Sequence, residues 1–400
     1  MISLKKEKNK GAIWNASFVF LVVCSTSIAV AFYMVNPLLS QHIVSLGFDL
    51  SSAGIVVGLF SGAALFSRPI SGMFADRYNK KYILAGTFFV TGICTLGFCF
   101  ASQLIPLALV RVLQGFSFGM SSTVNISLAV EFIPEERMGE GLGYLSISNI
   151  IAAAVGPNCG IFLQRQIGIK SLFVIVSVIL SVGACLLLAL PYRFVRPEKE
   201  KLVFRFRNFI SLKAFPYALL TAVFSFSSGM VSSFLVLVGA ERRIDNISLY
   251  FTINAIMLFL VRFVVGKAAD RLPLQWIVIP ALLLVAVESL LLGHAPVLWL
   301  VLLASALKAT GQGVAQPALQ SACIRKLGSA QSGLAISTYY IGADIGQGIG
   351  PVVSGFISER FGYSVMFSFA ALLSCTAGAL YLILHCVARK RTKLRCQGEN

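Results

Sequence analysis

Long apolar stretches with few or no charged side chains recur along the whole chain of 400 residues. Each is about 20 residues long, the length that a helix needs to cross the hydrocarbon core of a bilayer. Because the bilayer offers no water to backbone polar groups, such stretches must be helices whose hydrogen bonds close internally. The chain is 57% hydrophobic and 12% charged, whereas soluble domains are about 25% charged. We therefore predict one all-α integral membrane protein.

The apolar stretches number about twelve, in two sets of about six. The first set is expected to begin near Ile13, Ser51, Tyr82, Leu104, Gly139 and Lys170, and the second near Ala214, Ile247, Gln275, Val297, Gln331 and Tyr363. We expect an N-terminal six-helix bundle over 1–192, a cytoplasmic linker over 193–213, a C-terminal six-helix bundle over 214–388 and a basic cytoplasmic tail over 389–400.

The two halves repeat short motifs at one spacing. Both motif pairs are offset by 194 residues, since 270 minus 76 and 350 minus 156 give the same number. Half-chain repeats are typical of transporters that handle their substrate between the halves, near the middle of the membrane. The repeated pairs are Asp76-Arg77 with Asp270-Arg271, and Gly156-Pro157 with Gly350-Pro351.

Lysines and arginines gather in alternate loops. They are dense before the first stretch, between the second and third, in the middle segment and after the last stretch. Cytoplasmic loops of membrane proteins carry this excess. We therefore place both termini and the linker in the cytoplasm, and the chain in the cell inner (plasma) membrane.

The net charge of +17 raises the alternative of a nucleic-acid protein. The cations lie in short loops between apolar stretches, which encodes membrane topology rather than a basic binding face. The nine cysteines show no metal-ligand spacing, so we expect no metal and no cofactor. The sequence also shows no catalytic triad and no phosphate-binding loop, so we expect no enzyme and no ATP-driven pump.

Three motifs resemble signatures of the major facilitator superfamily. They are Gly72-Met-Phe-Ala-Asp76-Arg77-Tyr-Asn-Lys80-Lys81, Arg111-Val-Leu-Gln114-Gly115 and Gly156-Pro157-Asn-Cys-Gly160. The third resembles the drug:proton antiporter or efflux permease branch, although Ala152 and Ile161 replace two of that signature's glycines. The resemblance implies two pseudo-symmetric six-helix bundles that alternately expose a central cavity.

The first motif predicts a cytoplasmic gate. Gly72 and Asp76 lie four residues apart, on one helix face, and a glycine lets a neighbouring helix approach closely. A carboxylate at Asp76 can meet the positive N-terminus of another helix, and Arg77 can pair with the acidic loop at Glu131 or Glu136. The alternative is that the cations only set topology. The predicted gate comprises Gly72, Asp76, Arg77, Lys80, Lys81, Asp270 and Arg271.

The Gly-Pro pairs predict points of bending. A proline within a helix removes a backbone hydrogen bond and permits a kink. The alternative is a static kink that packs the two halves together. The predicted hinge residues are Gly156, Pro157, Gly160, Gly350 and Pro351.

Four ionisable residues fall deep inside apolar stretches, where such residues default to functional roles. Asp344 is the best candidate for a proton carrier, because burial disfavours its charged form. Lys308 is its expected counter-ion, with a purely structural pair or direct substrate contact as alternatives. The resemblance also ties Arg111 to proton coupling, with Asn36 its nearest polar substitute for an acid. We expect Glu288 to serve packing or the lipid interface.

The resemblance further implies a cavity lined by the first, fourth, seventh and tenth spans. Aromatic residues among its candidates would suit amphipathic ligands. The candidate cavity residues are Asn36, Gln114, Phe226, Gln312 and Gln316.

These features favour a monomeric, proton-coupled exporter of small molecules that works by alternating access. The partial antiporter signature separates it from the main alternative, a proton symporter that imports a metabolite. A non-transporting membrane receptor is the third hypothesis, and it lacks any soluble signalling domain in this sequence.

Overall fold

The computed structural model describes residues 14–134, 137–192, 211–269, 272–328 and 331–398, and it contains helices and no strand within them. The N-terminal half consists of α1 (Ala16–Val35), a 3₁₀ turn η1 (Asn36–Leu38), α2 (Leu39–Ser45), α3 (Leu50–Arg77), α4 (Lys80–Gly97), α5 (Leu104–Val130), α6 (Met138–Ile167) and α7 (Ile169–Leu188). The C-terminal half consists of α8 (Phe215–Glu241), α9 (Leu249–Ala269), α10 (Gln275–His294), α11 (Leu298–Leu327) and α12 (Ser332–Gly398).

Within the described ranges, nine helical segments are long and apolar enough to cross a membrane. The segment Leu334–Ile383 of α12 is 50 residues long, more than twice what one crossing of about 20 residues requires. Its helix turns at Gly362, whose φ of 80° suits glycine alone among common residues. Residues on either side of Gly362 therefore form two legs. The predicted all-α membrane fold with about twelve spans is confirmed to that approximation.

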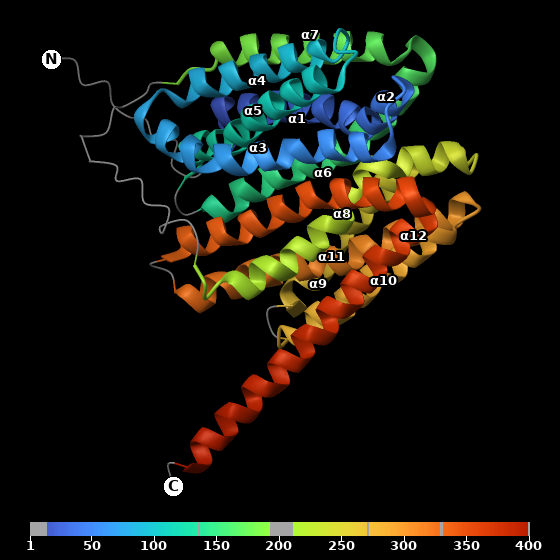
Figure 1. The fold of residues 1–400 in the computed structure, drawn as a ribbon. Helices are drawn as coiled ribbons and strands as arrows, with labels where there is room; N and C mark the ends of the chain where they lie inside the picture. Colours follow the sequence, from blue (N-terminus) through green and yellow to red (C-terminus); the bar gives the residue numbers. More distant parts are fainter. Residues whose placement is uncertain (1–13, 135–136, 193–210, 270–271, 329–330, 399–400) are drawn as a thin grey trace, which may run out of the picture.

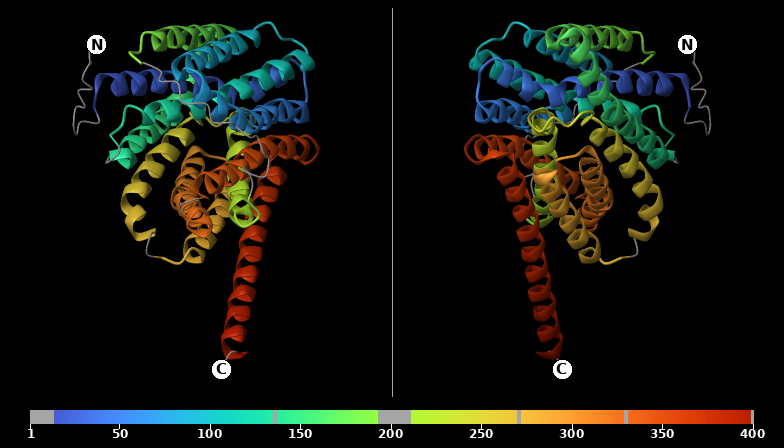
Figure 2. Two further views of the ribbon diagram at one scale, coloured as in Figure 1. Left: turned by 90° about the vertical axis from the view of Figure 1, so that its left-hand side faces the viewer. Right: turned by 90° about the vertical axis from the view of Figure 1, so that its right-hand side faces the viewer.

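The predicted division of the chain falls partly outside the structure. Most of the linker, 193–210, lies beyond the described residues, and the helices that flank it end at Leu188 and begin at Phe215. No break marks position 389, because α12 stays helical to Gly398. Figure 2 shows this last stretch as a long helix that projects from the C-terminal half.

Two groups of helices lie side by side (Figure 1), the first formed by α1–α7 and the second by α8–α12. They meet mainly where α3 packs on α12 and where α6 packs on α9. Glycines permit the first contact: a methyl group on Gly54 would strike the backbone of Pro351, and one on Gly58 would strike the backbone of Gly348. Small residues allow helices to approach closely in this way.

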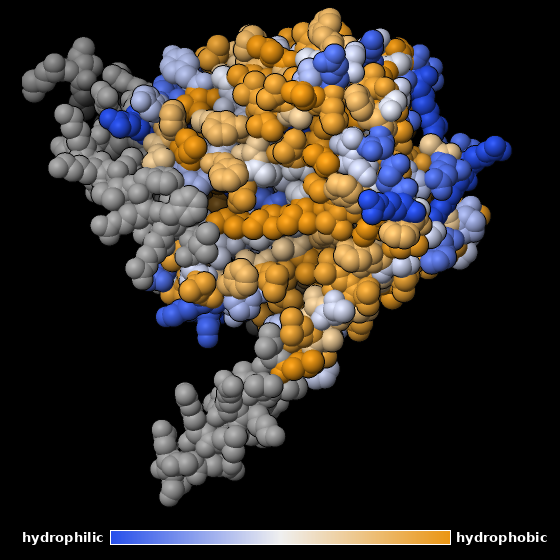
Figure 3. Space-filling model, viewed as in Figure 1, coloured by the Kyte–Doolittle hydropathy of each residue, from blue (hydrophilic) through white to orange (hydrophobic). Residues whose placement is uncertain are grey.

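Apolar side chains cover the middle of the molecule. Figure 3 shows a broad hydrophobic surface over the helices, with hydrophilic side chains gathered mostly toward the ends of the bundle. Large side chains such as Phe66 and Leu109 are exposed within the spans, at 68% and 66%. An exposed apolar area of this extent needs a partner, and lipid is the partner that these spans require.

Hydrogen bonds identify the two ends of the bundle. At one end, Asn15 donates to the Phe132 carbonyl at 2.7 Å, and Lys80 pairs with Glu131. At the other, the backbone N–H of Leu50 donates to Glu359 at 2.6 Å. We name these the Asn15 end and the Asp49 end, after the residues that cap α1 and α3.

Candidate functional site

A cavity of about 460 Å³ lies between the two halves, near the middle of the bundle. The N-terminal half lines it with α1, η1 and α6, and the C-terminal half with α8, α9, α11 and α12. Polar side chains are frequent in its wall, and Lys308 is the one charged residue among the described residues that line it. Five carboxamides also line it: Asn36, Asn149, Asn254, Gln312 and Gln347.

Lys308 belongs to a buried cluster in the C-terminal half. Its ammonium lies 3.9 Å from a carboxylate oxygen of Glu288, and the side chains are 5% and 0% exposed. Tyr250 donates to the same carboxylate at 2.8 Å, Ser289 at 3.1 Å and Ser227 at 3.4 Å. Glu288 was expected to serve packing or the lipid interface. The structure buries it behind the cavity wall rather than at the lipid interface, and these donors compensate its charge.

Arg111 lies in a corresponding cluster in the N-terminal half. Its guanidinium donates to Asn36 at 2.8 Å and to Gln114 at 2.7 Å, and it stacks over the Phe60 ring at 4.3 Å. Gln114 in turn donates to Thr95 at 3.2 Å. No carboxylate partners Arg111 among the described residues, and its Nε lacks a hydrogen-bond partner there.

The two clusters occupy equivalent places in the repeat. Lys308 is 194 residues after Gln114, and Ser289 is 194 residues after Thr95, the same offset as the repeated motifs (308 minus 114 and 289 minus 95). Each cluster joins one helix to its neighbour: α5 to α4 in the first half and α11 to α10 in the second. The repeat offset therefore relates Lys308 and Ser289, the chain neighbour of Glu288, to the Arg111 cluster of the first half.

The expected pair of Asp344 with Lys308 is wrong. Asp344 accepts two hydrogen bonds from Arg68, at 2.5 and 3.0 Å, and Arg68 also lies over the Tyr340 ring at 5.5 Å. Lys308 faces Glu288 instead. Asp344 and Arg68 come from α12 and α3, so this ion pair joins the two halves. Arg68 was missed as a candidate, although it opens the segment that repeats between the halves.

The predicted cavity residues separate into two groups. Asn36 and Gln312 lie in the cavity wall. Gln114 is instead buried in its own half with Arg111, and Phe226 packs against Phe369 in the C-terminal core. Gln316 lies about one turn beyond Gln312 on α11, past the residues that line the cavity. Amide and hydroxyl groups are more frequent in this wall than the aromatic side chains that were predicted to line it.

The predicted gate residues lie at the Asn15 end. A methyl group on Gly72 would meet none of the described atoms within 4 Å, so no described helix approaches Gly72 closely in this structure. Arg77 is exposed, and Glu131 pairs with Lys80 rather than with Arg77. Lys81 donates to the carbonyls of Leu188 and Leu190, both at 3.1 Å. The side chain of Asp76, and Asp270 and Arg271 entirely, lie outside the described part of the chain.

These lysines hold together helices of one half rather than bridging the two. Lys81 supplies a cation to the C-terminal end of α7, where the helix dipole favours positive charge. The Tyr192 hydroxyl also meets the Glu131 carboxylate. Burial, as the larger cause, and this carboxylate both raise the pKa of Tyr192. The cluster therefore fixes the start of α4 against the ends of α5 and α7.

The predicted hinge residues are points of close packing. A methyl group on Gly156 would strike Tyr33 of α1, one on Gly160 would strike Met34, and one on Gly350 would lie 2.5 Å from the Phe226 carbonyl of α8. Pro157 lines the central cavity. Pro351 meets Gly54 across the halves. Both prolines lie within continuous helices.

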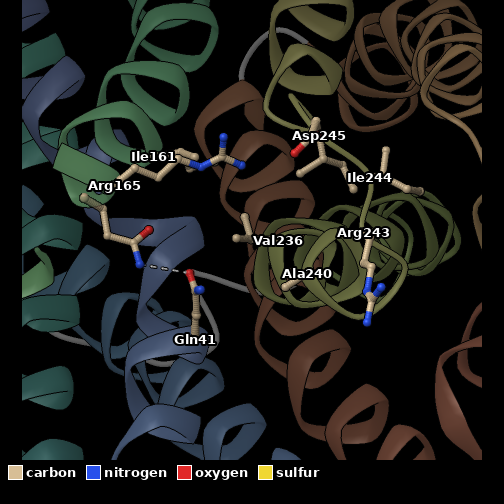
Figure 4. A pocket seen from close by; sticks show the side chains of 11 residues that line it. Gln41, Ile161, Arg165, Val236, Ala240, Arg243, Ile244 and Asp245 are labelled. Atoms are coloured by element: carbon tan, nitrogen blue, oxygen red, sulfur yellow. Dashed lines mark hydrogen bonds between the residues drawn. The ribbon is translucent and has the colours of Figure 1, made fainter.

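A second cavity of about 330 Å³ lies between the halves toward the Asp49 end. Figure 4 shows Arg165 and Asp245 directed toward one another across it. The side-chain amide of Gln164 donates to the side-chain oxygen of Gln41 at 3.3 Å. Arg243 also lines this cavity, in the left-handed backbone region with a φ of 54°. The described residues hold no cluster of three or more metal-ligating side chains, in either cavity or elsewhere.

Comparison with known proteins shows which family shares this architecture. The family model of the Major Facilitator Superfamily matches residues 21–243 and 217–397. An uncharacterized MFS-type transporter of Methanocaldococcus jannaschii is 24% identical over 390 residues, covering 94% of this chain and 98% of the relative. The multidrug resistance protein MdtG of Citrobacter koseri is 25% identical over 357 residues, covering 85% and 88%. The crystal structure of the nucleoside transporter NupG matches with a TM-score of 0.75 at 14% identity, covering 93% and 99%.

Proposed function

Since this chain is a multi-pass membrane transporter that belongs to the Major Facilitator Superfamily, we propose that it exports a small molecule in exchange for protons. The main supporting observation is the cavity of about 460 Å³ that both halves line around Lys308. Similarity to a relative named for multidrug resistance supports export. The substrate binds in this cavity, and rotation of one half against the other exposes it to each side in turn.

Contacts between the halves support alternating access. At the Asp49 end, Gly54 lies against the Pro351 backbone, Leu50 bonds to Glu359, and Asn158 of α6 donates to Thr252 of α9 at 2.7 Å. These contacts support closure of that end. At the Asn15 end, no described atom lies within 4 Å of a methyl group placed on Gly72, which supports an open path there. The distribution of lysine and arginine assigns that end, with both termini, to the cytoplasm.

Three membrane-buried groups support proton coupling. Asp344 is our proton carrier, since it is 12% exposed and its partner Arg68 belongs to the other half. Protonation of Asp344 weakens this pair, so that proton binding is coupled to the relative position of α3 and α12. Lys308 and Arg111 interact electrostatically with a charged substrate in the cavity. Gly72, Asp76 and Arg77 form the cytoplasmic gate, and the Gly-Pro segments flex between states.

The cellular setting follows from the same features. The protein acts as a monomer in the cell inner membrane, with lipid, protons and its substrate as partners. Transport needs no cofactor, because the proton gradient supplies the energy.

Everted membrane vesicles test this function. A metabolite comparison between a deletion strain and its parent first identifies the compounds that accumulate inside the cells lacking the transporter. These compounds should enter everted vesicles that contain the protein and dissipate a gradient that is acid inside. Vesicles with an Asp344→Asn variant at equal protein level should do neither. Uptake that leaves the proton gradient unchanged would exclude proton exchange.

One contact favours the alternative of proton symport. Lys308 lies within 3.9 Å of Glu288, so a proton on Glu288 would free the ammonium to bind an anion, and proton and anion would then move together. In the vesicle assay, import by symport predicts that the substrate leaves everted vesicles together with protons.

A further inference from the structure

The described lining of the central cavity carries positive charge and no negative charge. Lys308 is the one charged residue in its described lining. Glu288, the carboxylate nearest to Lys308, is fully buried behind the wall. An organic cation in this cavity would lie beside an ammonium with no lining carboxylate to compensate it. Burying a charge without an opposite charge or hydrogen bonds is costly. The wall therefore disfavours cationic ligands.

The Lys308 ammonium retains capacity to donate. A charge-assisted N–H···O bond is normally about 2.7–2.9 Å long, and the distance from Lys308 to Glu288 is 3.9 Å. Tyr250, at 2.8 Å, makes the short bond to that carboxylate oxygen. An ammonium has three N–H donors, so Lys308 can donate into the cavity without losing the electrostatic contact with Glu288.

The other half of the cavity presents a second donor. Asn36 lines the cavity, and its side-chain oxygen accepts from Arg111 at 2.8 Å. This bond orients the carboxamide so that its NH₂ group is the part left for a ligand. The Arg111 charge, with no carboxylate partner among the described residues, adds a positive field behind it. Donors thus come from both halves, Asn36 from one and Lys308 from the other.

From this arrangement we infer that the transported compound is a small, polar organic carboxylate, anchored by Lys308 and Asn36. The inference rests on the proposed function only in taking this cavity as the transport site. A single carboxylate matches the single lining cation, whereas a phosphate carries about −1.5 to −2 near neutral pH. The carboxamides and hydroxyls of the wall accept a ligand body rich in hydrogen-bonding groups, and the volume of about 460 Å³ suits a metabolite.

Binding to the purified full-length protein in lipid nanodiscs, without a gradient, tests the inference. Three probes of similar size differ in charge: N-acetylglutamine (anion), N-acetylglutaminamide (neutral) and glutaminamide (cation). Calorimetry should give the anion at least about tenfold tighter binding than the neutral probe, since hydrogen bonds to charged groups are the stronger ones. The cation should bind most weakly. Equal binding of anion and neutral probe, or no binding of the anion, overturns the inference.

Variants assign the preference to Lys308. Lys308→Met should remove the preference for the anion, Lys308→Arg should keep it, and Lys170→Met, at an exposed lysine outside the cavity, should leave it unchanged. Since Lys308→Met leaves Glu288 buried without a cation, the double variant Lys308→Met with Glu288→Gln gives a second test with both charges removed. A double variant that still prefers the anion overturns the role of Lys308.

The binding test and the vesicle test can refute the carboxylate site and the proposed transport function independently of one another. Anion binding without proton exchange would sustain the carboxylate site and refute proton-coupled export. Proton exchange with a cationic compound would refute the carboxylate site and sustain the transporter.

Discussion

Arg68 on α3 holds both carboxylate oxygens of Asp344 on α12, through Nε at 2.5 Å and Nη2 at 3.0 Å. The two residues are 276 positions apart in the sequence and belong to different halves. A two-point bond of this kind fixes direction as well as distance. Any movement that separates α3 from α12 at this depth must break it, so the pair links the charge of Asp344 to the relation between the halves.

Asp344→Asn should abolish gradient-driven transport while ligand binding remains measurable. The amide preserves the size of the side chain and removes the group that takes up a proton. Uphill accumulation in vesicles is the measurement, with substrate binding in detergent as its companion. Glu359→Gln is a matched control, because Glu359 also joins α12 to α3, at the Asp49 end. Full uphill transport by Asp344→Asn would remove Asp344 from coupling.

The double variant Asp344→Asn with Arg68→Gln separates coupling from structure. If the pair only holds the halves together, the single variant leaves the half-buried Arg68 guanidinium without its partner. The double variant removes both charges, and transport should recover. If Asp344 carries the proton, the double variant should exchange labelled substrate at equilibrium but fail to concentrate it. Recovery of uphill transport would therefore contradict the proton-carrier role.

Lys308→Met should destabilise the protein more than the double variant Lys308→Met with Glu288→Gln. Removing one member of a buried ion pair costs about 3–5 kcal/mol, and removing both charges costs less. A thiol-reactive dye can follow thermal unfolding, since Cys24 and Cys323 are buried and free. Equal melting temperatures for the single and double variants would show that Lys308 and Glu288 do not interact.

Gly346→Ala should destabilise the C-terminal half. A methyl group at this position of α12 would strike the Ala222 carbonyl of α8, and overpacking of this kind costs about 1–3 kcal/mol. Gly86→Ala is the control, because no described atom lies within 4 Å of its added methyl group. The dye assay should show a lower melting temperature for Gly346→Ala and an unchanged or higher one for Gly86→Ala. The reverse order would contradict the packing of α12 on α8.

Asp76→Asn should leave the protein inserted in the membrane but slow its turnover at least about tenfold, which corresponds to loss of roughly 1.4 kcal/mol of transition-state stabilisation. The substitution removes the carboxylate that, in our proposal, meets a helix N-terminus at the cytoplasmic gate. Initial transport rates at matched protein level give the measurement. A normal rate would reduce Asp76 to a residue without a gating role.

A cysteine placed at position 393 tests the orientation of the membrane spans. In a variant without native cysteines, Lys393→Cys should react with a membrane-impermeant maleimide in everted vesicles and not in intact cells. Labelling from the outside of intact cells would invert the assigned orientation, and with it the side to which the cavity opens.

The spans were predictable from the sequence because they are local properties. Uninterrupted apolar length and the charges that flank it decide where a helix enters and leaves lipid. The predicted starts at Leu104 and Gln275 coincide with those of α5 and α10, and the predicted start at Ser51 lies one residue from that of α3. The repeat offset of 194 residues also identified the two-half architecture before any contact was known.

Which ionisable side chains meet depended on the tertiary structure. Sequence depth placed Asp344 and Lys308 at similar levels on adjacent helices, yet Asp344 faces Arg68 and Lys308 faces Glu288. Depth follows from counting residues along a helix, whereas the direction of a side chain depends on how its helix is rotated against every neighbour. That rotation comes from packing between residues hundreds of positions apart, such as Gly54 against Pro351. The sequence therefore determined the spans and their order, and only helix packing decided which charges became partners and which one faces the cavity.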